Sequence, residues 1–406
     1  MVKTYHQTDS SKEEKREQYL KAEYAMLYLT ACGLHGIKPD IAAVRAMDLE
    51  AVYAISHQQS LSAITFTALA LTEDENLHHT PIFLRWQEAK NKAIAKNALL
   101  DIERTKLCAF LDEKQIWYLP LKGIVLKTFY PKPEMRQMAD NDILFDAAYE
   151  QTVHDYFTAQ GYTSKSYGVS HHDIYQKPPI LNFEMHTDLF YKTHDPVWDT
   201  YYSDIKSRLL CDHHYAYRFR DEDFYIYLIT HMYKHYSFGG IGVRSLLDCY
   251  VYNRVKGTAL DWCYVECELE KLGILTFEKK MRQLAWNVFS CPDNPSFSKL
   301  LPEEQDALTY FFASGTYGSV THRVQNDLKK INGQSSQVPI MVRLSYIITR
   351  FFPDPAFMRV WCNCYCPFLK LHPKLFFLAY PYRILTKGFK NMRQYIKECH
   401  IIMKIK

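Results

Sequence analysis

Two kinds of hydrophobic pattern divide the chain. From Glu13 to about Trp86, apolar residues recur every three or four positions with few Gly or Pro between them, which predicts an N-terminal helical region. The same spacing between about Phe83 and Asp112 predicts one long helix. It returns beyond about Asp195 and predicts a second helical region.

The middle third of the chain has a shorter, alternating pattern. The β-prone segments, each bounded by turn residues, lie at residues 116–120, 142–145, 162–168, 172–177 and 180–190. A helix that ends at Gly161 separates the second segment from the third. Because helices and strands mix only here, the sequence predicts an α+β protein. Its small mixed-sheet core, residues 86–192, would lie between helical regions at 1–85 and 193–406.

Acidic residues share a face on two of these segments. Side chains alternate along a strand, so Asp140 and Asp142 point the same way, as do Asn182, Glu184 and His186. Their apolar neighbours point to the opposite face, which would be core. If the two strands are neighbours, three carboxylates converge, and their ionisation requires nearby cations. Mg²⁺ suits such a site, since it takes oxygen ligands from carboxylates and substrate phosphates.

The order of these residues resembles a known family. The stretches "LPLKGIVLKTFYP", "MRQMADNDILF", "QGY" and "FEMHTDL" are similar to those of the bacterial uncharacterised nucleotidyltransferases, within the polymerase-beta-type nucleotidyltransferase superfamily. That group has a Leu-Lys-Gly stretch, an Arg shortly before Asp-x-Asp, and a Glu-x-His strand. The resemblance covers about residues 95 to 190 and continues weakly to about residue 252.

The resemblance implies an enzyme that moves a nucleoside monophosphate from a nucleoside triphosphate, such as ATP, to an acceptor hydroxyl and releases pyrophosphate. Asp140 and Asp142 would bind two Mg²⁺ ions. Glu184 would be the third metal ligand or the general base for the hydroxyl. The acceptor stays open: it could be a small molecule, a peptide, a protein side chain or an RNA end.

The resemblance also implies residues that bind the triphosphate. Gly123, at the start of a helix, would let the backbone approach the phosphates, and Lys122 and Arg136 are cations suited to phosphate oxygens. Arg136 could instead pair with Asp140 or Asp142. The wider superfamily has Gly-Ser or Gly-Gly where this chain has Lys-Gly, so no hydroxyl supplements the backbone here, and the choice of nucleotide stays open.

Two other functions fit the same residues. A phosphotransferase on this scaffold would keep Asp140 and Asp142 but release a nucleoside diphosphate. A non-catalytic protein that binds nucleotide or nucleic acid would not need the carboxylates and would use a basic surface instead.

Charge is uneven along the chain. The formal net charge is only +4, but nine basic residues between Lys370 and Lys406 accompany a single acid, Glu398, among many aromatic residues. This tail could dock on nucleic acid or an anionic membrane, or be the solvated face of a C-terminal helix.

Composition and the N-terminus bear on location. The N-terminal residues are polar and show no secretory signal, and no apolar stretch is long enough to span a bilayer. Eleven cysteines, an odd number, fit reduced thiols better than a disulfide framework. We therefore expect a cytoplasmic protein without a transmembrane helix.

Two further patterns have an ordinary structural explanation. Cys362, Cys364 and Cys366 alternate, which matches no zinc-binding spacing and is more typical of thiols on a strand or turn. Arg244 and Asp248 are four residues apart on a predicted helix and are expected to form a surface ion pair.

Overall fold

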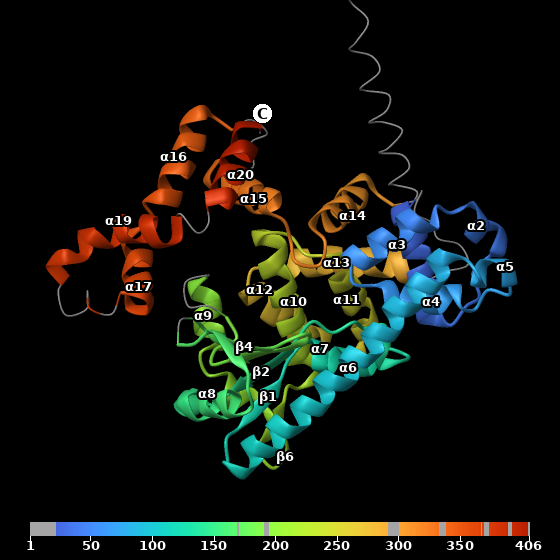
Figure 1. Cartoon of the computed structure of the whole chain (residues 1–406), viewed down its shortest axis with the longest axis horizontal. Helices are drawn as coiled ribbons and strands as arrows, with labels where there is room; N and C mark the ends of the chain where they lie inside the picture. The colour runs from blue at the N-terminus through green and yellow to red at the C-terminus, as the bar shows by residue number, and fades with distance from the viewer. Residues whose placement is uncertain are drawn as a thin grey trace, which may run out of the picture. The chain divides into compact units, whose positions relative to one another are not determined.

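The chain divides into two compact units. The computed structural model describes residues 22–168, 170–190, 195–290, 300–332, 338–366, 368, 373–388 and 392–404 (Figure 1). Unit 1 comprises Met1–Tyr233 and Gly242–Thr316, and unit 2 comprises Lys234–Ile241 and Tyr317–Lys406. The three-part division at residues 86 and 193 stays a prediction.

Unit 1 begins with the predicted helices. Residues 22–35 are helical and precede α2 (Ile41–Ala46), α3 (Leu49–Gln58), α4 (Ser62–Leu69), α5 (Glu75–His78) and α6 (Pro81–Glu113). Local sequence sets the start of the long helix α6. The Thr80 side chain caps it by accepting a hydrogen bond from the Phe83 N–H, and Pro81 occupies the first helical position.

A seven-stranded mixed sheet follows and confirms the α+β class. The strands are β1 (Tyr118–Pro120), β2 (Asn141–Phe145), β3 (Thr163–Ser166), β4 (His172–Lys177), β5 (Leu181–His186), β6 (Leu210–His213) and β7 (Ala216–Arg218). Their order in the sheet is β3-β4-β5-β2-β1-β7-β6. The β2–β5 and β1–β7 pairs are parallel, and the others are antiparallel.

Strands β6 and β7 correct the sequence analysis, which expects only helices beyond Asp195. The reason is physical. Every residue of the edge strand β6 is exposed, and β7 has only three residues, so neither shows the apolar alternation that marks a half-buried strand.

Short helices connect the strands, and longer ones follow the sheet. The connecting elements are α7 (Gly123–Leu126), η1 (Lys127–Phe129), η2 (Pro133–Met135), η3 (Ala147–Tyr149), α8 (Glu150–Ala159), α9 (Pro196–Tyr202) and η4 (Ile205–Arg208). The later helices are α10 (Asp221–Phe238), α11 (Val243–Lys256), α12 (Trp262–Lys271), α13 (Leu275–Phe289) and α14 (Pro302–Ser314). As predicted, the middle third mixes strands with helices.

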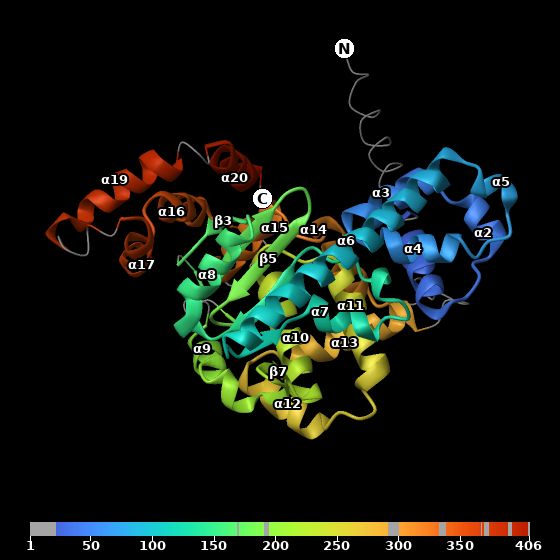
Figure 2. The ribbon, with the colours of Figure 1, turned by 60° about the horizontal axis from the view of Figure 1, so that its bottom comes forward.

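Both faces of the sheet are covered. On one face, Ile143 and Phe145 pack with residues of α6 and α8, and α6 crosses this face (Figures 1 and 2). On the other face, Leu119 and Leu144 join a cluster with α10 and α12. From the sequence, core is expected only on the face opposite the carboxylates. The structure shows a second core, on the face that carries Leu119 and Leu144.

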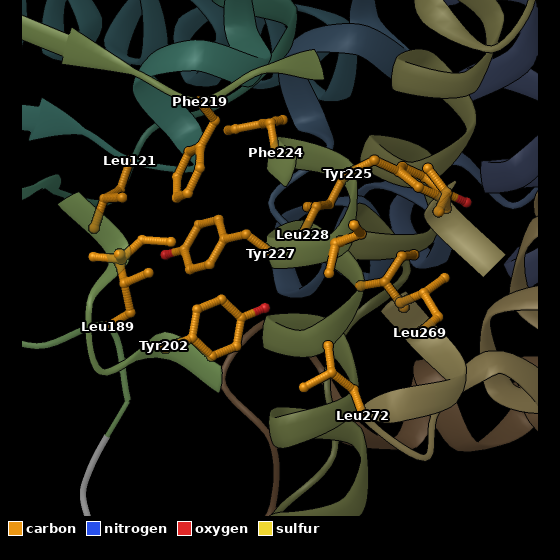
Figure 3. Packing of buried hydrophobic residues seen from close by; sticks show 14 of the residues in the cluster. Leu121, Leu189, Tyr202, Phe219, Phe224, Tyr225, Tyr227, Leu228, Leu269 and Leu272 are labelled. Carbon is orange, nitrogen blue, oxygen red and sulfur yellow. The ribbon is translucent and has the colours of Figure 1, made fainter. Parts of the chain in front are cut away.

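The α10 side of this second core is aromatic. Tyr227 points towards Leu121 and Leu189 (Figure 3), and its ring stacks on Phe219 with the centroids 5.3 Å apart. The hydroxyl of Tyr202 donates a hydrogen bond to the Thr230 hydroxyl at 3.0 Å. Residues of α10 therefore cover the face of the sheet that carries Leu119 and Leu144.

Unit 2 is helical. Its elements after Thr316 are α15 (Val320–Asn332), α16 (Ile340–Phe351), α17 (Pro355–Tyr365), η6 (Pro373–Leu378), α19 (Ala379–Arg383), η7 (Ile384–Gly388) and α20 (Met392–Lys404). Apolar residues of α15, α16 and α20 form its core. Across the described ranges, no helix is long and apolar enough to cross a membrane.

The cysteine pattern lies on a helix and its end, not on a strand or turn. Cys362 belongs to α17, and Cys366 follows it; both are buried beside Met358 and Trp361. They are four residues apart, the spacing that places two side chains on the same helix face. The side chain of Cys364 lies outside the described residues.

Candidate active site

The parallel pairing of β2 and β5 brings the predicted acids together. Asp142 lies directly opposite Glu184 in the register of the two strands. Ile143 and Met185, the next pair, enter the core on the opposite face. Asp140 immediately precedes β2, two residues from Asp142. The prediction that two separate extended segments supply converging carboxylates is therefore confirmed for Asp142 and Glu184.

Asp142 has two cationic or hydrogen-bonding neighbours. The Lys122 Nζ lies 3.3 Å from its Oδ2, and the His186 Nε2 lies 3.0 Å from its Oδ1. Burial opposes ionisation of Asp142, but the charge of Lys122 and the hydrogen bond from His186 outweigh burial and hold its pKa well below the usual range. Asp142 is therefore a carboxylate at neutral pH.

The other two acids are not neutralised to the same extent. Burial, followed by the charge of Asp142, raises the pKa of Asp140 to about 6. Burial, followed by the charges of Asp142 and Asp140, raises the pKa of Glu184 to about 8. Crowded acids of this kind favour any divalent cation that replaces their protons.

Two cations from distant parts of the chain also act on Asp140. Lys96 on α6 and Arg244 on α11 both lower its pKa, after the larger effect of Lys122. The Nη1 of Arg244 donates to the Gln137 carbonyl at 2.9 Å, which attaches α11 to the loop before β2. Lys96 and Arg244 cannot be recognised as site residues from the sequence, because only the packing of the helices brings them near Asp140.

The turn after β1 is strained at Lys122. This residue has φ 35° and ψ −103°, a conformation that L-residues rarely adopt. Lys122 is the N-cap residue of α7, which begins at Gly123. Backbone strain of this kind persists where the surrounding structure enforces it, often at functional sites. Here it accompanies the contact of Lys122 with Asp142.

Gly123 allows two side chains to pack against the backbone. A Cβ added at Gly123 would lie 2.5 Å from Nη1 of Arg136 and 2.9 Å from Sδ of Met138. A Cβ at this position would force the side chains of Arg136 and Met138 to shift. The observed close approach is therefore that of Arg136 and Met138, and an approach of phosphate to Gly123 stays a prediction.

Arg136 forms a buried ion pair. Its Nε and Nη2 each lie 2.8 Å from an oxygen of Asp248, and the Tyr130 hydroxyl donates to the same carboxylate at 2.8 Å. Asp248 is buried, so the expected surface pair with Arg244 is wrong: Asp248 on α11 binds Arg136 instead. Because this carboxylate binds Nε and Nη2 along one edge of the guanidinium, Arg136 pairs with Asp248 rather than forming the alternative pair with Asp140 or Asp142. Burial lowers the pKa of Arg136, but the charge of Asp248, and to a smaller extent that of Asp140, raises it above the usual value.

Histidines line the β4 side of the site. His172 Nε2 and His186 Nε2 each lie 3.9 Å from Glu184 Oε2. Ligand atoms of Asp142, Glu184 and His186 all lie within 4.8 Å of one another. Of these two histidines, only His186 is considered from the sequence. His172 is added to the cluster by the structure, because it pairs with His186 across β4 and β5.

These residues fit a divalent cation. Carboxylate oxygens are the ligands that Mg²⁺ prefers, and two of the three acids have raised pKa values that a bound cation would lower. The side chain of Glu184 is 25% exposed, so solvent reaches the cluster. Asp142 and Glu184, together with His186, are therefore chemically suited to hold the predicted metal, and the part of Asp140 in holding it stays a prediction.

Comparison with known proteins agrees with the geometry. A family model described as "Uncharacterised nucleotidyltransferase" matches residues 45–290, which is more than half of the chain. No curated protein and no solved structure gives a significant match. The matched segment contains the sheet, the three carboxylates and the helices that supply Lys96 and Arg244. The chain belongs to the uncharacterised nucleotidyltransferase family.

Proposed function

We propose that the protein is a Mg²⁺-dependent nucleotidyltransferase that transfers a nucleoside monophosphate from a nucleoside triphosphate to an acceptor hydroxyl in the cytoplasm. The observation that carries this proposal is the parallel register that places Asp142 opposite Glu184, with Asp140 two residues away. The low pKa of Asp142 and the raised pKa values of its neighbours support a cation between them.

The residues have distinct roles in the proposed reaction. Asp140 and Asp142 would hold Mg²⁺, and Glu184 would be a third ligand or accept the proton of the acceptor hydroxyl. The metal, when bound, supplies charge neutralisation for the triphosphate and the leaving pyrophosphate. His186 orients Asp142 through their 3.0 Å hydrogen bond. Lys122, whose Nζ lies beside Asp142, would contact phosphate oxygens.

The bond changes are those of an in-line displacement. The acceptor oxygen bonds to the α-phosphorus as the bond from that phosphorus to the bridging oxygen of pyrophosphate breaks. A proton acceptor is needed at the attacking hydroxyl, and a carboxylate whose raised pKa of about 8 falls when a cation binds is ionised and able to take that proton near neutral pH. Glu184 meets this requirement.

Labelled nucleotides test the proposal. Purified protein is incubated with each α-³²P nucleoside triphosphate, Mg²⁺ and a cell extract, and the products are separated. We expect label in a product with wild type, none with Asp140→Asn or after addition of EDTA, and normal transfer with Glu270→Gln, which changes an exposed acid on α12. Absence of transfer with every nucleotide would contradict the proposal.

The same assay distinguishes a phosphotransferase. With γ-³²P donors, that reaction would place label in the product and release a nucleoside diphosphate. Nucleotidyl transfer instead releases labelled pyrophosphate. A protein that binds nucleotide without either product would be the non-catalytic alternative.

We further propose that unit 2 docks on an anionic lipid surface. The helix α16 exposes an apolar stripe formed by Ile340, Met341, Leu344 and Ile348, which Phe352 extends. Met341 is 73% exposed. Such a stripe at helical spacing, which no described residue of unit 2 covers, is typical of a helix that lies in the plane of a membrane surface.

Charge supports an anionic partner. Residues 317–406 contain 15 Lys or Arg and 3 Asp or Glu. One of the acids, Glu398, is buried in ion pairs with Arg323 and Arg350, so it adds little negative charge to the surface. Basic residues next to aliphatic ones favour anionic lipid over nucleic acid, because exposed Ile and Met side chains gain little from a phosphate backbone.

Vesicle sedimentation tests the lipid surface. We expect the full-length protein to bind vesicles containing phosphatidylglycerol, to bind neutral phosphatidylcholine vesicles weakly, and to lose binding with Met341→Glu/Ile348→Glu. Leu84→Glu, which changes an exposed leucine of α6, is the matched control. Equal binding of the double variant would contradict the proposal, as would dimerisation without lipid or binding to nucleic acid that depends on Met341.

A further inference from the structure

Three histidines converge beside the carboxylates. His172 and His186 are direct cross-strand partners on β4 and β5, and His171 immediately precedes β4. The carbonyl of His171 accepts a hydrogen bond from the Thr187 N–H at 2.9 Å, which fixes the start of β4 against the end of β5. The backbone of two paired strands therefore holds all three imidazoles.

The imidazole nitrogens are close enough to share an ion. Nδ1 of His172 lies 3.3 Å from Nε2 of His171. The ring of His186 lies 5.0 Å from that of His172 and 5.8 Å from that of His171, measured between centroids. One nitrogen from each of the three residues lies within 4.8 Å of the others. A small rotation of these side chains would bring them to the ligand spacing of one metal ion.

The surroundings supply what a histidine-bound metal needs. Glu184 Oε2 lies 3.9 Å from Nε2 of both His172 and His186, so a carboxylate borders the histidine cluster and offsets the charge of a bound cation. Asp142 accepts the Nε2–H of His186 at 3.0 Å, and in that tautomer Nδ1 carries the lone pair. A carboxylate that fixes the tautomer of a ligating histidine is a common feature of zinc sites.

We propose that His171, His172 and His186 form a second metal site, which binds a transition-metal ion of the Zn²⁺ type rather than Mg²⁺. Imidazole nitrogens suit Zn²⁺, Co²⁺ and Ni²⁺, whereas Mg²⁺ prefers an all-oxygen site such as the neighbouring carboxylates. This site deepens the proposed function and rests on it, because the two clusters share His186, which is hydrogen-bonded to Asp142. Its test is read without nucleotide, so the two proposals can fail separately.

Metal stoichiometry tests the site. Full-length protein without a histidine tag is stripped with a chelator, incubated with Zn²⁺ and excess Mg²⁺, and dialysed before bound zinc is measured. We expect one Zn²⁺ per chain in wild type and in Asp140→Asn, and none in His171→Ala/His172→Ala. The single variant His172→Ala should bind at least roughly tenfold more weakly, as is typical when a metal site loses a supporting group.

Two controls separate this site from other donors. His213→Ala changes an exposed histidine on β6, at the opposite edge of the sheet, and should bind zinc as wild type does. Co²⁺ replaces Zn²⁺ in a parallel titration, where visible bands without the near-ultraviolet thiolate band indicate nitrogen ligands rather than cysteines. Far-ultraviolet circular dichroism verifies that each variant is folded.

The outcomes decide the proposal. Zinc lost in the double histidine variant, but kept in Asp140→Asn and His213→Ala, supports it. It is overturned if the double variant keeps its zinc, if Mg²⁺ displaces the zinc, or if wild type binds none. Loss of nucleotidyl transfer in Asp140→Asn with zinc retained would support both proposals independently.

Discussion

Substituting Glu184 by Gln should stabilise the metal-free protein at high pH. The side chain keeps its shape but loses the charge that burial disfavours and that Asp142 and Asp140 repel. The pKa of Glu184 is raised from 4.5 to about 8, and each pKa unit corresponds to about 1.4 kcal/mol. The fully ionised carboxylate therefore costs roughly 5 kcal/mol of folding free energy.

The gain in stability is smaller than this limit. Water reaches 25% of the Glu184 side chain, and the amide of Gln still has to be solvated, so we expect a gain on the order of 2 kcal/mol. Because the pKa is higher in the folded protein, the cost is absent below about pH 4.5, grows with rising pH, and is complete above about pH 8. At pH 9 the melting temperature should rise by roughly 4 to 8 °C.

Thermal unfolding followed by circular dichroism measures this effect. Wild type, Glu184→Gln and the exposed control Glu270→Gln are melted with EDTA from pH 5 to pH 9. Only Glu184→Gln should show a gain over wild type that increases with pH. Identical melting curves for Glu184→Gln and wild type at pH 9 would refute the claim that burial and the neighbouring carboxylates penalise the ionised form of Glu184.

Three other perturbations have defined outcomes. Asp248→Ala removes the carboxylate partner of the buried Arg136 charge and should lower the free energy of unfolding by about 3 to 5 kcal/mol, measured in urea. An unchanged unfolding midpoint would refute the structural role of the pair. Gly123→Ala should cost about 1 to 3 kcal/mol, because its Cβ meets Arg136 at 2.5 Å, whereas Gly239→Ala, with its nearest atom at 3.8 Å, should be nearly neutral. Adding Mg²⁺ at pH 9 should raise the melting temperature of wild type more than that of Glu184→Gln, and an equal rise would argue against a metal at Glu184.

The part of the site that follows strand alternation is predictable from the sequence. Asp142 and Glu184 alternate with core residues on their strands, and alternation fixes the face that each side chain occupies. Pairing of the two strands could only be assumed, because the hairpin of β3 and β4 lies between them in the chain. The structure supplies that pairing.

The cationic surroundings are less predictable. Lys96 lies on a helix that is mostly solvated, and no local pattern distinguishes it from other lysines of α6. The partner of Arg136 could not be identified either, because Asp248 is more than one hundred residues away in the chain and its burial depends on how α11 packs. Contacts of this range are set by tertiary packing rather than by local sequence.

The parallel pairing of β1 with β7 limits where the chain can be truncated without exposing a strand edge. A fragment that ends at residue 192 would lack β7 and leave the backbone of Tyr118 without the Tyr215 carbonyl that accepts its N–H at 2.9 Å. An unpaired strand edge invites association with other chains. Recombinant versions that retain residues up to Arg218, together with the helices that cover this face, should therefore stay monodisperse where shorter ones aggregate.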